Sequence, residues 1–156
     1  MKHMTISFRM ITHLMLAGTL AVLGPSGLGA QSAPEVAVFK SATCGCCVKW
    51  VDHLKANGFA TTSTNVEDMG VVKAKHSVPR SVHSCHTALV GGYVIEGHVP
   101  ASDIKRLLKE KPAISGIGVA GMPAGSPGME SATPQRYDVL SFDKQGQTRV
   151  YSTHGN

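Results

Sequence analysis

Apolar positions along residues 35–108 recur with two different spacings, and the spacing predicts where strands and helices lie. Residues 35–40 form a short apolar run typical of a strand buried on both faces. After a cysteine-rich loop, apolar residues recur at helical spacing at Cys47, Trp50, Val51 and Leu54. Asn57-Gly58 predicts the end of that helix. The remaining predicted elements are a strand at 59–66, a short helix at 68–76, strands at 87–90 and 93–96 around a turn at 91–92, a helix between Pro100 and Pro112, and a hairpin of 137–142 with 148–153.

This order of elements predicts the α/β class, with a mixed sheet, helices packed on its faces and a C-terminal β-hairpin. In the short helix at 68–76, Val71 and Val72 are expected to make the apolar contacts. Residues 113–134 fit neither spacing, because small and apolar residues alternate there with repeated glycine. A loop of this length in a compact domain is usually functional or disordered, so we interpret the stretch as a long structureless loop.

Residues 1–30 have the composition of a secretory signal peptide, which predicts an exported protein. Lys2 and Arg9 provide positive charge, residues 14–23 form an apolar core, and small residues near Ala30 offer a cleavage site. The core is shorter than the roughly 20 apolar residues of a membrane span, which disfavours a transmembrane anchor. Residues 31–156 then form one domain that has no membrane attachment once the signal is cleaved.

Charge and short motifs exclude several functions. The leader carries two of the five net positive charges, so residues 31–156 carry a net charge of +3 without any block of Lys and Arg. That balance argues against a nucleic-acid partner. The chain also lacks the G-x-S-x-G, P-loop and H-E-x-x-H motifs of hydrolases, nucleotide-binding proteins and zinc proteases.

The chemistry of the chain is concentrated in its four cysteines. Cys44, Cys46 and Cys47 lie between the first predicted strand and the first predicted helix, where a helix N-terminus favours thiolate over thiol. A C-x-x-C at the first strand-to-helix turn is the layout of thioredoxins and glutaredoxins, although residues 80–85 interrupt that layout after Pro79. The cysteines can serve as ligands for a soft metal, as a redox pair or as a structural disulfide.

Four motifs, quoted in order, make the chain resemble a known family. They are Thr43-Cys44-Gly45-Cys46-Cys47, Ser84-Cys85-His86-Thr87-Ala88, the stretch from Gly92 to Pro100, and the stretch from Gly121 to Glu130. Together they resemble the periplasmic CopG-type copper-resistance proteins, over nearly all of residues 35–154. The resemblance implies a thioredoxin-like fold, a periplasmic location and copper handling through the cysteines.

The predicted metal ligands are Cys44, Cys46, Cys47 and Cys85. Cu(I) is soft and prefers two to four sulfur ligands. Four thiolate charges are better neutralised by several Cu(I) ions than by one, so more than one copper per chain is expected. A closed zinc site is disfavoured, because the adjacent Cys46 and Cys47 would chelate one tetrahedral ion awkwardly.

Four further side chains are open candidates for copper ligation: His86, His98, Met122 and Met129. His86 is the less obvious partner, because a strand residue next to Cys85 is expected to point to the opposite face. The two methionines can either bind Cu(I) from the glycine-rich loop or fill a gap in the core. Trp50 is expected to be a packing residue.

The sequence therefore predicts a periplasmic copper-binding protein that sequesters Cu(I), or transfers it to other periplasmic copper-handling proteins, in copper resistance. The alternative is a thiol-disulfide oxidoreductase of the glutaredoxin type. Enzymatic turnover on copper or on thiols stays open, because the same thiolates serve both purposes.

Overall fold

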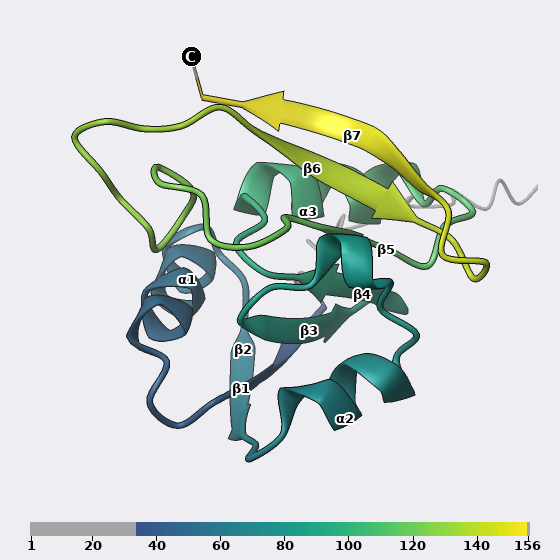
Figure 1. Ribbon diagram of the computed structural model, residues 1–156, viewed down its shortest axis with the longest axis horizontal. Helices are drawn as coiled ribbons and strands as arrows, with labels where there is room; N and C mark the ends of the chain where they lie inside the picture. Colours follow the sequence, from purple (N-terminus) through teal and green to yellow (C-terminus); the bar gives the residue numbers. More distant parts are fainter. Residues whose placement is uncertain (1–33, 156) are drawn as a thin grey trace, which may run out of the picture. The chain divides into compact units, whose positions relative to one another are not determined.

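The computed structural model describes residues 34–155 (Figure 1), so the predicted signal peptide lies outside the described residues. The described helices are α1 (Gly45–Ala56), α2 (Met69–Lys75), the short 3₁₀ helix η1 (Arg80–Val82) and α3 (Ala101–Glu110). The described strands are β1 (Val36–Lys40), β2 (Thr61–Asn65), β3 (His86–Val90), β4 (Tyr93–Glu96), β5 (Gly116–Gly118), β6 (Tyr137–Phe142) and β7 (Thr148–His154). None of the helices in residues 34–155 has the length and apolar character of a membrane span.

The seven strands described in residues 34–155 form one mixed sheet in the order β2-β1-β3-β4-β5-β6-β7. Strand β1 pairs parallel to β2 and antiparallel to β3, and β4 pairs parallel to β5. The predicted C-terminal hairpin is present as the antiparallel pair β6 and β7, and it joins the sheet through β5. The α/β class, the mixed sheet and the terminal hairpin are therefore confirmed.

Helices α1 and α3 cover one face of the sheet, because their apolar stripes and one face of the strands share a single core. Trp50 and Leu54 of α1 and Ile104 of α3 are fully buried there, against strand residues that include Ala88 and Ile95. Strand residues that point the other way, such as Val94, pack in a second cluster with η1. Helix α2 lies apart from α1 and α3 (Figure 1) and contacts β1 and β3.

Strand β5 lies inside the stretch that the sequence analysis treats as structureless, so that prediction is wrong for residues 116–118. Gly116 pairs opposite Phe142, and a Cβ on Gly116 would come within 2.7 Å of the Phe142 ring. Only glycine fits this position, and a strand with glycine at both ends shows no alternation of apolar and polar residues. Residues 119–134 contain no helix or strand, as predicted for that part of the loop.

Helix α2 begins after Asp68, whose Oδ1 accepts a hydrogen bond from the N–H of Gly70 at 2.7 Å. The expectation that Val71 supplies an apolar contact is wrong, because its side chain is 64% exposed. The buried residue of this helix is Lys73, which forms an ion pair with Glu96 of β4. A charged partner on a distant strand, rather than an apolar stripe, attaches this helix to the sheet.

Candidate metal centre

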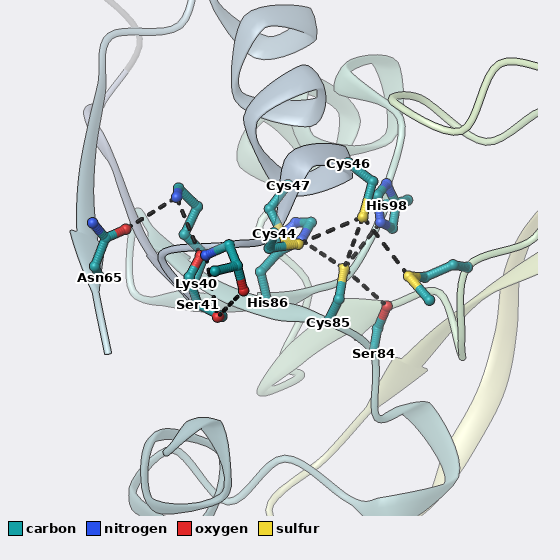
Figure 2. The surroundings of a disulfide bond; sticks show 12 residues. Lys40, Ser41, Cys44, Cys46, Cys47, Asn65, Ser84, Cys85, His86 and His98 are labelled. Carbon is teal, nitrogen blue, oxygen red and sulfur yellow. Dashed lines mark hydrogen bonds between the residues drawn. A yellow bond between two sulfur atoms is a disulfide. The ribbon is translucent and has the colours of Figure 1, made fainter. Parts of the chain in front are cut away.

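The sheet brings the two cysteine-bearing segments together. Strand β1 ends at Lys40 and leads through a short loop to Cys44, which is the N-cap residue of α1. Strand β3 lies antiparallel to β1, with His86 opposite Lys40. Cys85 immediately precedes β3, so it lies beside the start of α1, where the other three cysteines lie (Figure 2).

All four predicted ligands meet in one place, where their sulfur atoms lie within 4.8 Å of one another. Cys44 and Cys47 form a disulfide with a Cα–Cα distance of 5.3 Å. Cys46 and Cys85 are free thiols. The Cys46 sulfur lies 3.5 Å from that of Cys44 and 4.0 Å from that of Cys85 (Figure 2). The cluster can therefore exist as a disulfide with two thiols or, after reduction, as four thiols.

His98 contacts Cys85 in a defined tautomer. Its Nδ1 lies 2.8 Å from the carbonyl oxygen of Pro127, which can only accept, so Nδ1 carries the proton. Its Nε2 then has a free lone pair, and it lies 3.0 Å from the Cys85 sulfur. Burial lowers the pKa of His98, which keeps the ring neutral. This nitrogen is in place to accept a hydrogen bond from the Cys85 thiol or to bind a metal beside the sulfur.

His86 also contacts Cys85, so the expectation that it points to the opposite face is wrong. Its Nδ1 lies 3.3 Å from the Cys85 sulfur. The alternation argument fails because β3 begins at His86, and Cys85 lies outside the strand. The His86 ring packs 4.3 Å from the Trp50 ring, centroid to centroid, and burial lowers its pKa to about 3. Its buried Nε2 has no hydrogen-bond partner among the described residues, which is least costly if Nδ1 carries the proton and donates it to the Cys85 sulfur.

The glycine-rich loop 119–136 lies over the cluster. Met122 is 49% exposed, and its Sδ lies 3.8 Å from the Cys46 sulfur, so it is not a core residue. Met129 is half-buried and lines an open groove with Cys46, Lys49 and Glu130. The loop approaches α1 closely at Gly128, whose φ is +85° and where a Cβ would lie 2.8 Å from the carbonyl oxygen of Cys46.

The environment of Cys85 favours its protonated form. Burial, and then the neighbouring Cys46, raise the pKa of the Cys85 thiol to about 12. Cys85 therefore keeps its proton at neutral pH until another positive charge replaces the proton. With four sulfurs, one thioether and a neutral imidazole nitrogen within reach, the donor set suits a soft cation, and Cu(I) in particular.

Two groups that sequence reasoning did not single out support this centre. Ser84 donates a hydrogen bond through its Oγ to the carbonyl oxygen of Gly121, which holds the loop next to Met122. Glu96 accepts a hydrogen bond from the N–H of Ser84 at 2.7 Å. A carboxylate within an apolar strand, directly after Val94 and Ile95, is the sequence signal that could have pointed to a buried role.

Comparison with known proteins agrees with this arrangement. Residues 82–129 match a family described as "Protein of unknown function, DUF411", whereas no curated protein sequence matches the chain. Two solved structures, "Copper resistance protein copG- Form 1" and "Copper resistance protein copG- Form 2", each share 42% identity and a TM-score of 0.75 with the chain. The matches cover 80% and 79% of this chain and 99% of each solved chain. Identity at this level over nearly the full length of the relatives shows common membership, and the chain belongs to the CopG family of copper resistance proteins.

Proposed function

We propose that this protein binds Cu(I) in the periplasm through the thiolates of Cys44, Cys46, Cys47 and Cys85, and that it sequesters or transfers copper. The observation that carries the proposal is the convergence of these four sulfur atoms within 4.8 Å. The protein family to which this chain belongs is named for copper resistance. Soft sulfur donors select Cu(I) over harder cations. A thioredoxin-like fold fits the C-x-x-C at the start of α1 in a mixed sheet, and we include that fold in the proposal.

The disulfide makes binding dependent on redox state. Reduction of the Cys44–Cys47 bond takes two electrons and two protons from a thiol reductant, which becomes a disulfide. Each Cu(I) that binds then replaces protons on the sulfur atoms. Oxidation back to the disulfide removes two thiolates and weakens the site. Reduction therefore opens the full site, and oxidation releases its metal.

Several Cu(I) ions per chain fit the site better than one. Four thiolates gathered in one place repel one another, and shared cations remove that repulsion. Cys46 is central in the cluster, since its sulfur is near those of Cys44 and Cys85 and near the Met122 thioether. Cys46 also lines the open groove, so copper can enter and leave by exchange of ligands at this sulfur.

Anaerobic titration of the reduced protein with Cu(I) against a competing chelator tests the proposal. We expect tight uptake of more than one copper per chain, with ultraviolet absorption from thiolate-to-copper charge transfer. Each of the four single Cys→Ser variants is expected to weaken uptake. If Cys46→Ser and Cys85→Ser take up copper like the unmodified protein, the four-sulfur site is wrong.

A thiol-disulfide oxidoreductase is the second candidate, and the Cys44–Cys47 disulfide at the start of α1 favours it. Exchange of this kind needs only the two cysteines of the pair. Cys85→Ser separates the two functions, because it should impair copper uptake and leave reduction of a disulfide substrate intact. Rapid reduction of such a substrate together with no tight copper uptake would assign the protein to this second function.

The periplasmic location rests on the signal-like composition of residues 1–30. Fractionation of cells that express the full chain tests it. We expect the protein in the periplasmic fraction with its N-terminus near residue 31. Recovery in the cytoplasm at full length would contradict the location and leave the copper chemistry untouched.

A further inference from the structure

Glu96 of β4 is fully buried and lies on the face of the sheet that α2 contacts, where Lys73 reaches it. Its Oε1 accepts hydrogen bonds from Lys73 Nζ and from the N–H of Ser84, the latter at 2.7 Å. Its Oε2 accepts a hydrogen bond from the Thr87 hydroxyl at 2.6 Å. One carboxylate therefore joins α2, β3 and the residue that immediately precedes Cys85.

Stability alone does not account for this ion pair. Lys73 is 5% exposed and Glu96 is fully buried, so both charges lose most of their hydration on folding. Replacing such a pair with apolar residues of similar size is often neutral or stabilising. What an apolar pair cannot supply is an acceptor for the Ser84 N–H, which would otherwise lack this partner.

Glu96 bonds a segment that no strand pairing of the sheet fixes in place. Residues 83–85 lie between η1 and the first residue of β3, outside the strand pairing. The Ser84 hydroxyl also donates a hydrogen bond to the carbonyl oxygen of Gly121, next to Met122. The N–H of Gly121 donates a hydrogen bond to the carbonyl oxygen of His83 at 3.1 Å. A shift of Ser84 would therefore move Cys85 and the methionine-bearing loop together.

We propose that Glu96 is a positioning residue for Cys85. Lys73 and Thr87 fix the carboxylate, the carboxylate fixes the Ser84 N–H, and the fixed backbone holds the Cys85 sulfur 4.0 Å from that of Cys46. What positions Cys85 is the hydrogen-bond acceptor that residue 96 offers to the Ser84 N–H, and not the negative charge of the Glu96 carboxylate. The effect expected on copper rests on the proposed function, whereas the effect on the placement of Cys85 does not.

Two double variants separate the acceptor from the charge. K73M/E96Q removes both buried charges and keeps an amide oxygen for the Ser84 N–H. K73M/E96M also removes both charges and has a side chain of similar length, but it offers no such acceptor. Because buried charge and side-chain volume are nearly matched, any difference between the two variants reports on the hydrogen bonds that residue 96 accepts from the Ser84 N–H and the Thr87 hydroxyl. Of these two donors, Ser84 is the neighbour of Cys85.

The first measurement needs no copper. In a background where Cys44 and Cys47 are serines, a small-molecule disulfide oxidises Cys46 and Cys85 to one bond: two thiols lose two electrons and two protons, and the oxidant becomes two thiols. We expect K73M/E96M to close this bond about tenfold more slowly than K73M/E96Q, because misplaced groups lose effective concentration. Thermal unfolding of both variants controls for loss of fold.

The second measurement is Cu(I) affinity with all four cysteines present, where K73M/E96M is expected to bind about tenfold more weakly than K73M/E96Q. Equal closure rates for the two variants would overturn the proposal. If K73M/E96M does not fold, K73M/E96Q is compared with the unmodified pair, and slow closure there would show that charge is needed and would also overturn the proposal. If the unmodified protein does not bind copper, the proposed function fails while the closure rates still test the role of Glu96.

Discussion

A methyl group added at Gly128 would test how the loop 119–136 is held against α1. Gly128 has a φ of +85°. In Gly128→Ala the Cβ would lie 2.8 Å from the Cys46 carbonyl oxygen and 2.8 Å from the Trp50 backbone nitrogen. Gly58→Ala is the matched control, because Gly58 has a φ of +87° and open space around its Cβ position. The left-handed backbone should destabilise both variants by about 1–2 kcal/mol. The clash adds roughly 1–3 kcal/mol in Gly128→Ala alone, since backbone atoms cannot rotate away.

Chemical denaturation gives the two losses in unfolding free energy, and reaction of the free Cys46 with a chromogenic disulfide reports on the loop. If the loop moves off the helix instead of straining it, the extra loss in unfolding free energy shrinks. Cys46 then reacts faster, because Met122 no longer covers it. Equal free-energy losses in the two variants, with unchanged Cys46 reactivity, would refute the close packing of Gly128 on α1.

Three further outcomes are expected. Burial lowers the pKa of His53, and its neutral Nε2 accepts a hydrogen bond from the Ala101 N–H at 3.1 Å. The contribution of His53 to stability is therefore present above its pKa in the unfolded chain, near 6.5, and is lost as pH falls through its lower pKa in the folded protein. Urea midpoints of His53→Gln should therefore fall less steeply with acid than those of the unmodified protein, and equal slopes would contradict this. Met122→Leu should weaken Cu(I) binding about tenfold, roughly 1.4 kcal/mol, in a chelator competition. The same substitution should change unfolding free energy by less than about 0.5 kcal/mol, because the side chain is half exposed; a larger loss would place Met122 in the core. Cu(I) at about 100 times its dissociation constant should stabilise the reduced protein by roughly 2.7 kcal/mol in a thermal melt, reversed by a chelator, and an unchanged melt would argue against binding to the folded state.

Most of the fold between β1 and α3 follows from periodic sequence. Strand β4 lies at residues 93–96, as predicted after the turn at 91–92, and the buried residues of α1 are those with helical spacing. Strand β5 could not be predicted in the same way, because its pairing depends on the absence of a side chain at Gly116 and not on any apolar pattern. Local periodicity carries no information about which backbone a glycine approaches.

The meeting of the four cysteines was predictable from the resemblance to a thioredoxin layout, in which the loop that carries Cys85 faces the start of the first helix. Their role as metal ligands stays a prediction. The contact between His86 and Cys85 was missed, since it depends on the exact residue at which β3 begins. The burial of Lys73 was missed because its partner lies 23 residues away on another element.

The antiparallel register of β1 and β3 makes the completed centre a marker of successful folding. Cys46 and Cys85 are 39 residues apart in sequence, and the pairing of β1 with β3, in which Lys40 lies opposite His86, brings their segments together. An unfolded chain offers copper three neighbouring thiols at most, without the fourth sulfur or the imidazole of His98. The folded chain should therefore hold copper more tightly than its own unfolded form, so copper itself would favour correctly folded molecules.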